Sequence, residues 1–141
     1  LACEEALKKV GKSAADVYLV VPHQANLRII ESVAKKAGVP MERVFTNVDR
    51  YGNMSAATVP VALCEALEAG RVKPGALLLM PSFGGGLTFT GHVVRWGDRV
   101  TPLATSDVQL APATHTALEL VNRYRDIKSL KVTKVDVATS S

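Results

Sequence analysis

Three short segments of the sequence carry residue types that can do chemistry. His23 lies in the segment VPHQAN, Asn53 lies 30 residues later in YGNMSAAT, and a run of three glycines, 84–86, follows Ser82 and Phe83. An imidazole, a carboxamide and bare backbone N–H groups can each donate a hydrogen bond to a carbonyl oxygen on which negative charge develops. Each segment also has a structural explanation: a surface or capping histidine, an asparagine that forms a turn or cap, and a tight hairpin. Taken one at a time, they leave the chemistry open.

The residues around His23 predict that it stands at the edge of a buried sheet. Residues 17–21 (VYLVV) form a β-rich apolar run that ends at Pro22, and such runs are typical of strands buried on both faces. Ligand crevices in open α/β sheets form where strands end. A helix is predicted over 24–37, because its apolar residues repeat at helical spacing, and Gly38 is its expected C-cap.

The rest of the first hundred residues predicts a layered α/β unit with a mixed sheet. An opening helix ends near Gly11, a short strand covers 43–47, a helix runs to about Ala69, and strands cover 76–80 and 87–96, the last two as a hairpin. Pro60 requires that the helix before Ala69 begins late, near Thr58, or bends. Because a strand follows the glycine run, that run is not expected to be a phosphate-binding loop.

Composition argues against several classes of function. The formal net charge is +4, from 17 Lys/Arg and 13 Asp/Glu, aromatics make up 5%, and no basic run exceeds two residues, so a nucleic-acid surface is not predicted. No apolar stretch approaches the roughly 20 residues of a transmembrane helix, so no membrane span is expected. Cys3 and Cys64 are predicted on the apolar sides of helices, as small buried hydrophobes and not as disulfide partners or metal ligands. A reducing cytoplasm is the expected location.

Two domains are predicted. Residues 1–99 form the α/β unit, and residues 100–141, rich in Thr, Ser, Ala, Pro and Val, form an extension that is partly helical, over about 114–129, or loosely ordered. The sequence begins inside a helical pattern, which predicts that the chain is a fragment. We therefore expect one face of the sheet to be stripped and to expose a large apolar patch.

Taken together, the segments PHQANLRI, YGNMSAATVP and SFGGGLTF resemble the β-ketoacyl-acyl carrier protein synthase III family in motif, order and spacing. The resemblance covers residues 1 to about 97. It implies an α/β, thiolase-like layered fold, of which this chain would be the C-terminal half-domain with a mixed β-sheet flanked by helices. It also implies an acyltransferase that starts fatty-acid synthesis, by decarboxylative Claisen condensation of an acyl-coenzyme A starter with malonyl-acyl carrier protein.

The resemblance assigns roles to particular residues. His23 and Asn53 would donate hydrogen bonds that stabilise the enolate, and for this His23 must be a neutral Nε2–H donor. Gly85 would offer a backbone N–H to the oxyanion of the acyl thioester, with Phe83 as an apolar wall beside the nucleophile. A separate group would serve the incoming substrates: Ala25 and Asn26 would line the pantetheine arm, and Arg28 would meet the acidic carrier protein, although a solvated helix face explains Arg28 equally well.

The resemblance also implies what this chain lacks. The family nucleophile is a cysteine at a buried helix N-terminus in the half that would precede this chain, so neither Cys3 nor Cys64 replaces it and the isolated chain should be inactive. Coenzyme A and acyl carrier protein thioesters would be substrates, with no cofactor and no metal, and a homodimer would form through the N-terminal half. Two alternatives remain open: a related acyltransferase that uses an oxygen or nitrogen acceptor in secondary metabolism, and a non-catalytic interaction module of the same fold.

Overall fold

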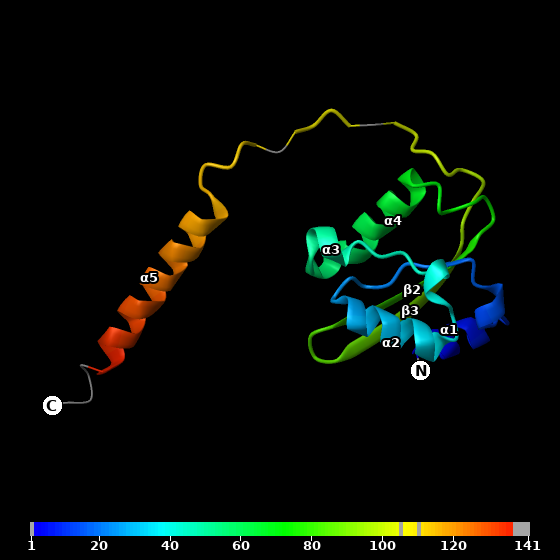
Figure 1. Cartoon of the computed structure of the whole chain (residues 1–141), viewed down its shortest axis with the longest axis horizontal. Helices are drawn as coiled ribbons and strands as arrows, with labels where there is room; N and C mark the ends of the chain where they lie inside the picture. Colours follow the sequence, from blue (N-terminus) through cyan, green and yellow to red (C-terminus); the bar gives the residue numbers. More distant parts are fainter. Residues whose placement is uncertain (1, 105, 110, 137–141) are drawn as a thin grey trace. The chain divides into compact units, whose positions relative to one another are not determined.

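The computed structural model describes residues 2–104, 106–109 and 111–136, and its backbone divides into two compact units, residues 1–104 and residues 105–141 (Figure 1). The division falls five residues beyond the boundary that composition predicts. Within the described residues, no helix is both long and apolar enough to span a membrane.

A mixed sheet forms the centre of the first unit. Within the described residues it has the strand order β1 (Leu19–Val20), β2 (Leu77–Gly84) and β3 (Thr88–Arg95). β1 runs parallel to β2, and β2 pairs antiparallel with β3 from one end of the hairpin to the other. The predicted mixed sheet and its final hairpin are therefore confirmed. The strand predicted over 43–47 is wrong in extent, because only a single bridge, between Val44 and Val20, joins that segment to the sheet.

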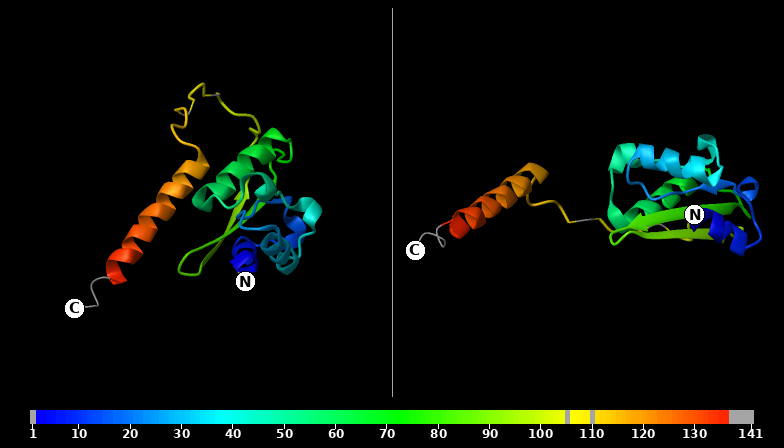
Figure 2. Two further views of the ribbon diagram at one scale, coloured as in Figure 1. Left: turned by 60° about the vertical axis from the view of Figure 1, so that its left-hand side comes forward. Right: turned by 90° about the horizontal axis from the view of Figure 1, so that it is seen from below.

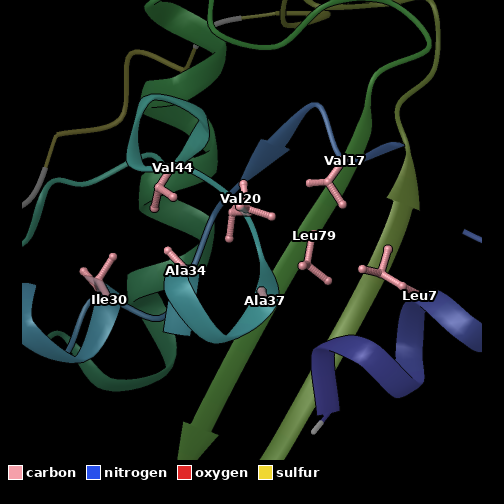
Figure 3. Close-up of a cluster of buried hydrophobic side chains, with 9 residues drawn as sticks. Leu7, Val17, Val20, Ile30, Ala34, Ala37, Val44 and Leu79 are labelled. Carbon is pink, nitrogen blue, oxygen red and sulfur yellow. The ribbon is translucent and has the colours of Figure 1, made fainter. Parts of the chain in front are cut away.

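Helices cover both faces of β1 and β2. Val20 and Leu79 pack against α1 (Ala2–Lys9) and α2 (Leu27–Ala37) on one face (Figure 3). Their chain neighbours Leu19 and Leu78 point the other way and pack against the apolar residues of α4 (Thr58–Glu68), so that the sheet lies between helical layers (Figure 2). The alternation of strand side chains produces two cores. The expected stripped face is therefore wrong for β1 and the first part of β2, which are buried on both sides within this chain, whereas β3 is largely exposed.

Local signals explain both ends of α2. Asn26 caps the helix, its Oδ1 accepting a hydrogen bond from the Ile29 backbone N–H at 3.0 Å, so the helix begins at Leu27 and not at Gln24. Gly38 ends it in the left-handed conformation, with φ +70°, as predicted. The helix buries a stripe of three residues, Ile30, Ala34 and Ala37, against the first core.

Pro60 shifts the beginning of α4 instead of bending the helix. A 3₁₀ turn over Ser55–Ala57 precedes the helix, which starts at Thr58, so Pro60 falls in the first turn, where backbone N–H groups lack intrahelical partners. The helix buries a narrow stripe of Thr58, Ala62 and Ala66. Cys64 lies outside this stripe and is exposed, which corrects the expectation that it is buried. The larger residues Val59, Leu63 and Leu67 are only partly buried against the same core.

Short helical turns connect these elements. They are two 3₁₀ turns, Ala14–Asp16 and Met41–Arg43, and the single-turn helix α3 (Val48–Tyr51), which leads directly to Asn53. The described part of the second unit contains α5 (Ala117–Asp136), which begins three residues later than predicted and extends further. Thr116 and Glu119 form its capping box, because each side chain accepts a hydrogen bond from the other residue's backbone N–H.

Candidate active site

A cavity of about 820 Å³ brings the three motif segments together. His23, Asn53 and the glycines Gly84 and Gly85 all line it, although they lie up to 62 residues apart in the sequence. Its remaining lining residues are small or hydroxyl-bearing, together with Phe83: Ser55, Ala56, Thr58, Val59, Ser82, Thr88 and Thr90. The fold thus places an imidazole, a carboxamide and a bare backbone around one space.

His23 is held from several directions. Its backbone N–H donates to Pro81 O at 2.9 Å, which fixes the residue beside β2. Its ring meets the Phe83 ring edge to face, with centroids 4.9 Å apart and planes at 74°. Partial burial lowers the pKa of His23 below its ordinary value of 6.5, so the ring is neutral at neutral pH. The ring nitrogen Nδ1 lies 2.6 Å from Thr58 Oγ1.

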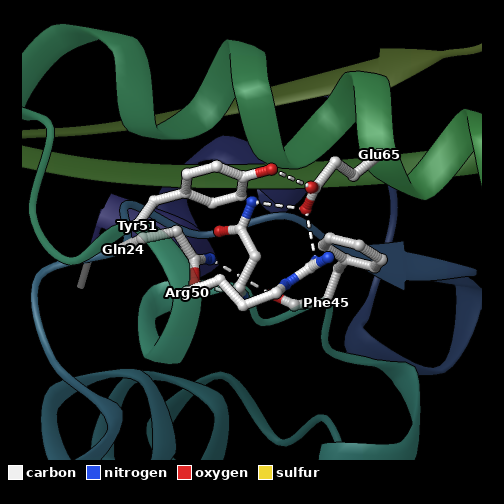
Figure 4. A network of polar contacts seen from close by, with 6 residues as sticks. Gln24, Phe45, Arg50, Tyr51 and Glu65 are labelled. Carbon is white, nitrogen blue, oxygen red and sulfur yellow. Dashed lines mark hydrogen bonds and ion pairs between the residues drawn. The ribbon is translucent and has the colours of Figure 1, made fainter.

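Gln24, the residue after His23, locks the loop that carries the histidine. Its side chain is fully buried, and Nε2 donates to Pro22 O at 2.9 Å and to Phe45 O at 3.2 Å. Its Oε1 accepts from the backbone N–H of Asn47 at 2.9 Å. The motif glutamine therefore joins the histidine loop to the segment that leads into α3 (Figure 4).

Asn53 lies at the cavity with its amide oriented by the backbone. Its Oδ1 accepts from the Ser55 N–H at 2.9 Å, so the donor end of the amide, Nδ2, is turned away from that group. Ser55 itself has φ +56°, a left-handed conformation that is unfavourable for a residue with a side chain. Backbone strain of this kind is concentrated at functional sites. The amide oxygen of Asn53 is thus held by the backbone, and Nδ2 takes no part in that bond.

A polar network anchors α3, which precedes Asn53, to α4. Glu65 accepts hydrogen bonds from Asn47 Nδ2 at 2.8 Å and from the Tyr51 hydroxyl at 2.6 Å, and it pairs with Arg50 at 2.6 Å (Figure 4). The hydrogen bonds from Tyr51 and Asn47, followed by the charge of Arg50, lower the pKa of Glu65, whereas the carboxylate raises the pKa of Tyr51. The network fixes both ends of the turn that leads to Asn53.

The glycine run forms the end of the β2–β3 hairpin. Gly85 lies on the cavity wall, and Gly86 and Leu87 both adopt left-handed conformations, with φ +82° and +49°. The sequence predicted this hairpin, and glycine tolerates the turn geometry that it requires. A main chain without side chains therefore faces the cavity at Gly84 and Gly85.

The three residues assigned to substrate approach lie outside the cavity lining. Ala25 is half-buried and Asn26 is exposed, with its side-chain oxygen engaged in capping α2. Arg28 is exposed in the first turn of α2. The structure thus separates these residues from the group formed by His23 and Asn53.

A second, more apolar cavity of about 460 Å³ shares four lining residues with the first, namely His23, Ser82, Phe83 and Thr90. Cys3, Ile29 and Phe89 are among its other lining residues. Burial raises the pKa of the Cys3 thiol, which disfavours the reactive thiolate. Neither Cys3 nor the exposed Cys64 lines the larger cavity. Among the described residues, no group of three or more His, Cys, Asp or Glu side chains has the arrangement of a metal site.

Sequence reasoning missed Gln24, Thr58 and Glu65, which support the site without carrying its expected chemistry. A glutamine and a threonine that are fully buried imply hydrogen-bond partners. Their partners lie as far as 35 residues away, and a single sequence does not show such pairs. The one available signal was the polar Gln24 between an apolar strand and an amphipathic helix.

Comparison with known proteins agrees with this architecture. Residues 7–96 match the family model described as 3-oxoacyl-[acyl-carrier-protein (ACP)] synthase III C terminal. The chain is 49% identical over 122 residues to β-ketoacyl-[acyl-carrier-protein] synthase III 2 of Vibrio cholerae, covering 86% of this chain and 34% of the relative. It is 59% identical over 92 residues to β-ketoacyl-[acyl-carrier-protein] synthase III of Roseiflexus sp., covering 65% of this chain and 28% of the relative.

Solved structures give the same result. The crystal structure of 3-oxoacyl-[acyl-carrier-protein] synthase III from Aquifex aeolicus matches with a TM-score of 0.66 and 49% identity, over 67% of this chain and 31% of that one. The chain spans about a third of the length of the curated relatives that it matches. Because the match to the Vibrio protein covers 86% of the 141 residues, it extends beyond the end of β3 at Arg95 and reaches the beginning of α5 at Ala117.

Three findings point to one family: the α/β fold, the order of the motif segments, and the family match over most of the first unit. The chain belongs to the 3-oxoacyl-[acyl-carrier-protein] synthase III family, of which it carries the C-terminal, thiolase-like half-domain.

Proposed function

We propose that this chain supplies the enolate-stabilising part of a condensing site that joins an acyl-coenzyme A starter to malonyl-acyl carrier protein. In this reaction the acyl group first moves to a cysteine, which releases coenzyme A. The malonyl thioester then loses carbon dioxide, and the resulting carbanion attacks the acyl-cysteine carbonyl. The thiolate leaves, and the product is a β-ketoacyl-acyl carrier protein that starts fatty-acid synthesis.

The observation that carries the proposal is the convergence of His23 and Asn53 on one cavity. Decarboxylation leaves negative charge on the thioester oxygen, and two neutral donors would stabilise that charge. Burial lowers the pKa of His23 and so favours the neutral ring, and the hydrogen bond from Ser55 turns the donor end of the Asn53 amide away from the backbone. One preorganised donor of this type contributes about 2.7–4 kcal/mol in other enzymes.

The β2–β3 hairpin would stabilise the acyl-cysteine and not the malonyl enolate. Gly85 lies on the wall of the same cavity, where its backbone N–H would stabilise the oxyanion formed at the acyl-cysteine. Phe83 borders both cavities and packs edge to face on His23. We assign it the apolar wall beside the nucleophile, where it would also hold the imidazole in place.

We place the nucleophilic cysteine outside this sequence. The raised pKa of Cys3 and the position of Cys64, away from the larger cavity, make both poor nucleophiles. This chain alone would therefore bind and orient the malonyl group but form no carbon–carbon bond. The complete enzyme would need no cofactor, because its substrates are thioesters. We further propose that it works in the cytoplasm, as a homodimer formed through the N-terminal half.

Arg28 would meet the acidic carrier protein. It is an exposed cation in the first turn of α2, five residues from His23 in the sequence. Ala25 and Asn26 lie between these two residues, where the pantetheine arm would pass from the protein surface toward the site. The cap formed by Asn26 supports this arrangement, because it fixes the first turn of α2.

A product assay with the complete enzyme that contains this chain tests the proposal. Incubation with an acyl-coenzyme A and malonyl-acyl carrier protein should release carbon dioxide and form a β-ketoacyl-acyl carrier protein, detected by intact mass. Acyl transfer to an alcohol or amine without carbon dioxide release would instead indicate the related acyltransferase. Absence of both reactions would indicate a non-catalytic module.

A further inference from the structure

A series of short polar contacts through Ser55 and Thr58 connects the two proposed donors, His23 and Asn53. Asn53 Oδ1 accepts from the Ser55 N–H at 2.9 Å, and the carbonyl oxygen of Ser55 lies 3.0 Å from Thr58 Oγ1. Thr58 Oγ1 in turn lies 2.6 Å from His23 Nδ1. Ser55, which has a left-handed backbone, connects the two sides. Its N–H bonds to the Asn53 side chain, and its carbonyl oxygen contacts Thr58, whose hydroxyl lies next to the His23 ring.

The hydroxyl of Thr58 has one proton and two possible acceptors. If the proton points to Ser55 O, then His23 Nδ1 must carry a proton of its own to bond to Oγ1, and the neutral ring has a bare Nε2. If the hydroxyl donates to Nδ1, the single proton of the neutral ring lies on Nε2. Thr58 is fully buried, so water does not compete for this choice.

The two distances favour the second arrangement. A separation of 2.6 Å is shorter than the range of about 2.7–3.2 Å for an N–H group that donates to an oxygen, so a protonated Nδ1 fits poorly as the donor to Oγ1. The 3.0 Å contact to Ser55 O is at the long limit for a hydroxyl donor. The distances thus favour donation of the hydroxyl proton to Nδ1 over donation to Ser55 O, which also accepts the Thr58 backbone N–H.

We propose that Thr58 is a positioning residue, whose hydroxyl donates to Nδ1 and so holds His23 as the Nε2–H tautomer. This inference rests on the proposed function, in which a neutral Nε2–H donates to the enolate oxygen. Thr58 does not touch the substrate in this role. It acts through His23, and the Phe83 ring limits rotation of the imidazole from another side.

Nitrogen-15 NMR of the histidine side chains in the 141-residue chain tests this directly, with His92→Gln and His115→Gln used to assign the signals of His23. At neutral pH the wild type should show a protonated Nε2 and a bare, hydrogen-bonded Nδ1. Thr58→Val keeps the shape but removes the hydroxyl, so it should lose the Nδ1 hydrogen-bond signature. Thr58→Ser should retain it. A protonated Nδ1 in the wild type would overturn the proposal, and so would a Thr58→Val spectrum identical to that of the wild type. If Thr58→Val fails to fold, the wild-type spectrum alone decides the question.

Kinetics of the complete enzyme provide the functional readout. Thr58→Val should slow carbon dioxide release by less than the roughly 10²-fold expected for loss of His23 itself, leave acyl-enzyme formation unchanged, and be rescued by Thr58→Ser. Equal slowing of both half-reactions in Thr58→Val would count against the positioning role. Normal carbon dioxide release in His23→Ala would refute the proposed function alone, because the NMR result stands independently of it.

Discussion

Replacement of Gln24 by methionine tests whether the buried glutamine holds the histidine loop in place. Methionine has a similar length and no hydrogen-bonding amide, so Gln24→Met removes bonds to Pro22 O, Phe45 O and the Asn47 N–H while it keeps most of the volume. All three bonds go to main-chain groups, and Gln24 is fully buried. The substitution therefore changes hydrogen bonding more than packing.

The magnitude follows from those contacts. Three hydrogen bonds at about 0.5–1.5 kcal/mol each, with the Asn47 N–H then buried without its partner, predict a loss of about 2–4 kcal/mol in the free energy of unfolding. Urea denaturation of the chain measures this loss. Gln109→Met, the same chemical change at an exposed position, is the matched control and should stay within about 0.5 kcal/mol of wild type. If Gln24→Met also stays within that range, the glutamine does not hold the loop and the reasoning is refuted.

Three further predictions follow. Gly91→Ala should destabilise the chain by about 1–3 kcal/mol in thermal or urea denaturation, because the new Cβ would lie 2.9 Å from a backbone oxygen of α1. Gly97→Ala, which has open space around it, should change stability little, and equal effects of the two variants would contradict the packing of α1 on β3. At low salt, Arg28→Glu should raise the KM for malonyl-acyl carrier protein more than Lys35→Glu, which makes the same charge change later in α2. Equal KM values for the two variants would show that Arg28 has no docking role. Because burial lowers the pKa of His23, the unfolded chain binds more protons than the folded one near pH 6. The free energy of unfolding should therefore fall as pH drops from about 6.5 through the folded pKa. His23→Ala should flatten this part of the plot of urea midpoint against pH, and an unchanged slope would contradict the prediction.

Local patterns predicted the elements that depend on local physics. The periodicity of α2, its Gly38 cap and the hairpin that turns at the glycine run are confirmed, because helical amphipathicity and turn chemistry depend on neighbouring residues. Pro60 also constrained α4 correctly, because a proline without an N–H fits only the first turn. These elements could be predicted without knowledge of tertiary contacts.

Features that depend on tertiary contacts were predicted less well. Cys64 was expected on a buried face, but the sheet accepts the small side chains of Ala62 and Ala66, which leaves the cysteine outside. The expected stripped face was wrong for β1 and the first part of β2, because α1 and α2 cover one side of them and α4 covers the other, whereas β3 is largely exposed. A count of apolar residues does not reveal which helix covers which strand.

The candidate site shows the same division. The motif segments identified His23, Asn53 and Gly85, and the structure places all three around one cavity. Thr58, which contacts the His23 ring across 35 residues of sequence, was not found, because its partner follows from the fold and not from its neighbours. The roles of these residues in the reaction remain predictions.

Separation of the two half-reactions tests the central claim most directly. In the complete enzyme, His23→Ala and Asn53→Ala should each slow carbon dioxide release by on the order of 10²-fold or more, while acyl-cysteine formation, followed by intact mass, stays close to wild type. The double variant should lose less than the product of the two single effects, because residues that act on one oxygen are not additive. If acyl-cysteine formation falls as far as carbon dioxide release in His23→Ala, then His23 serves chiefly as the base for the cysteine, and the account of an enolate-stabilising pair is wrong.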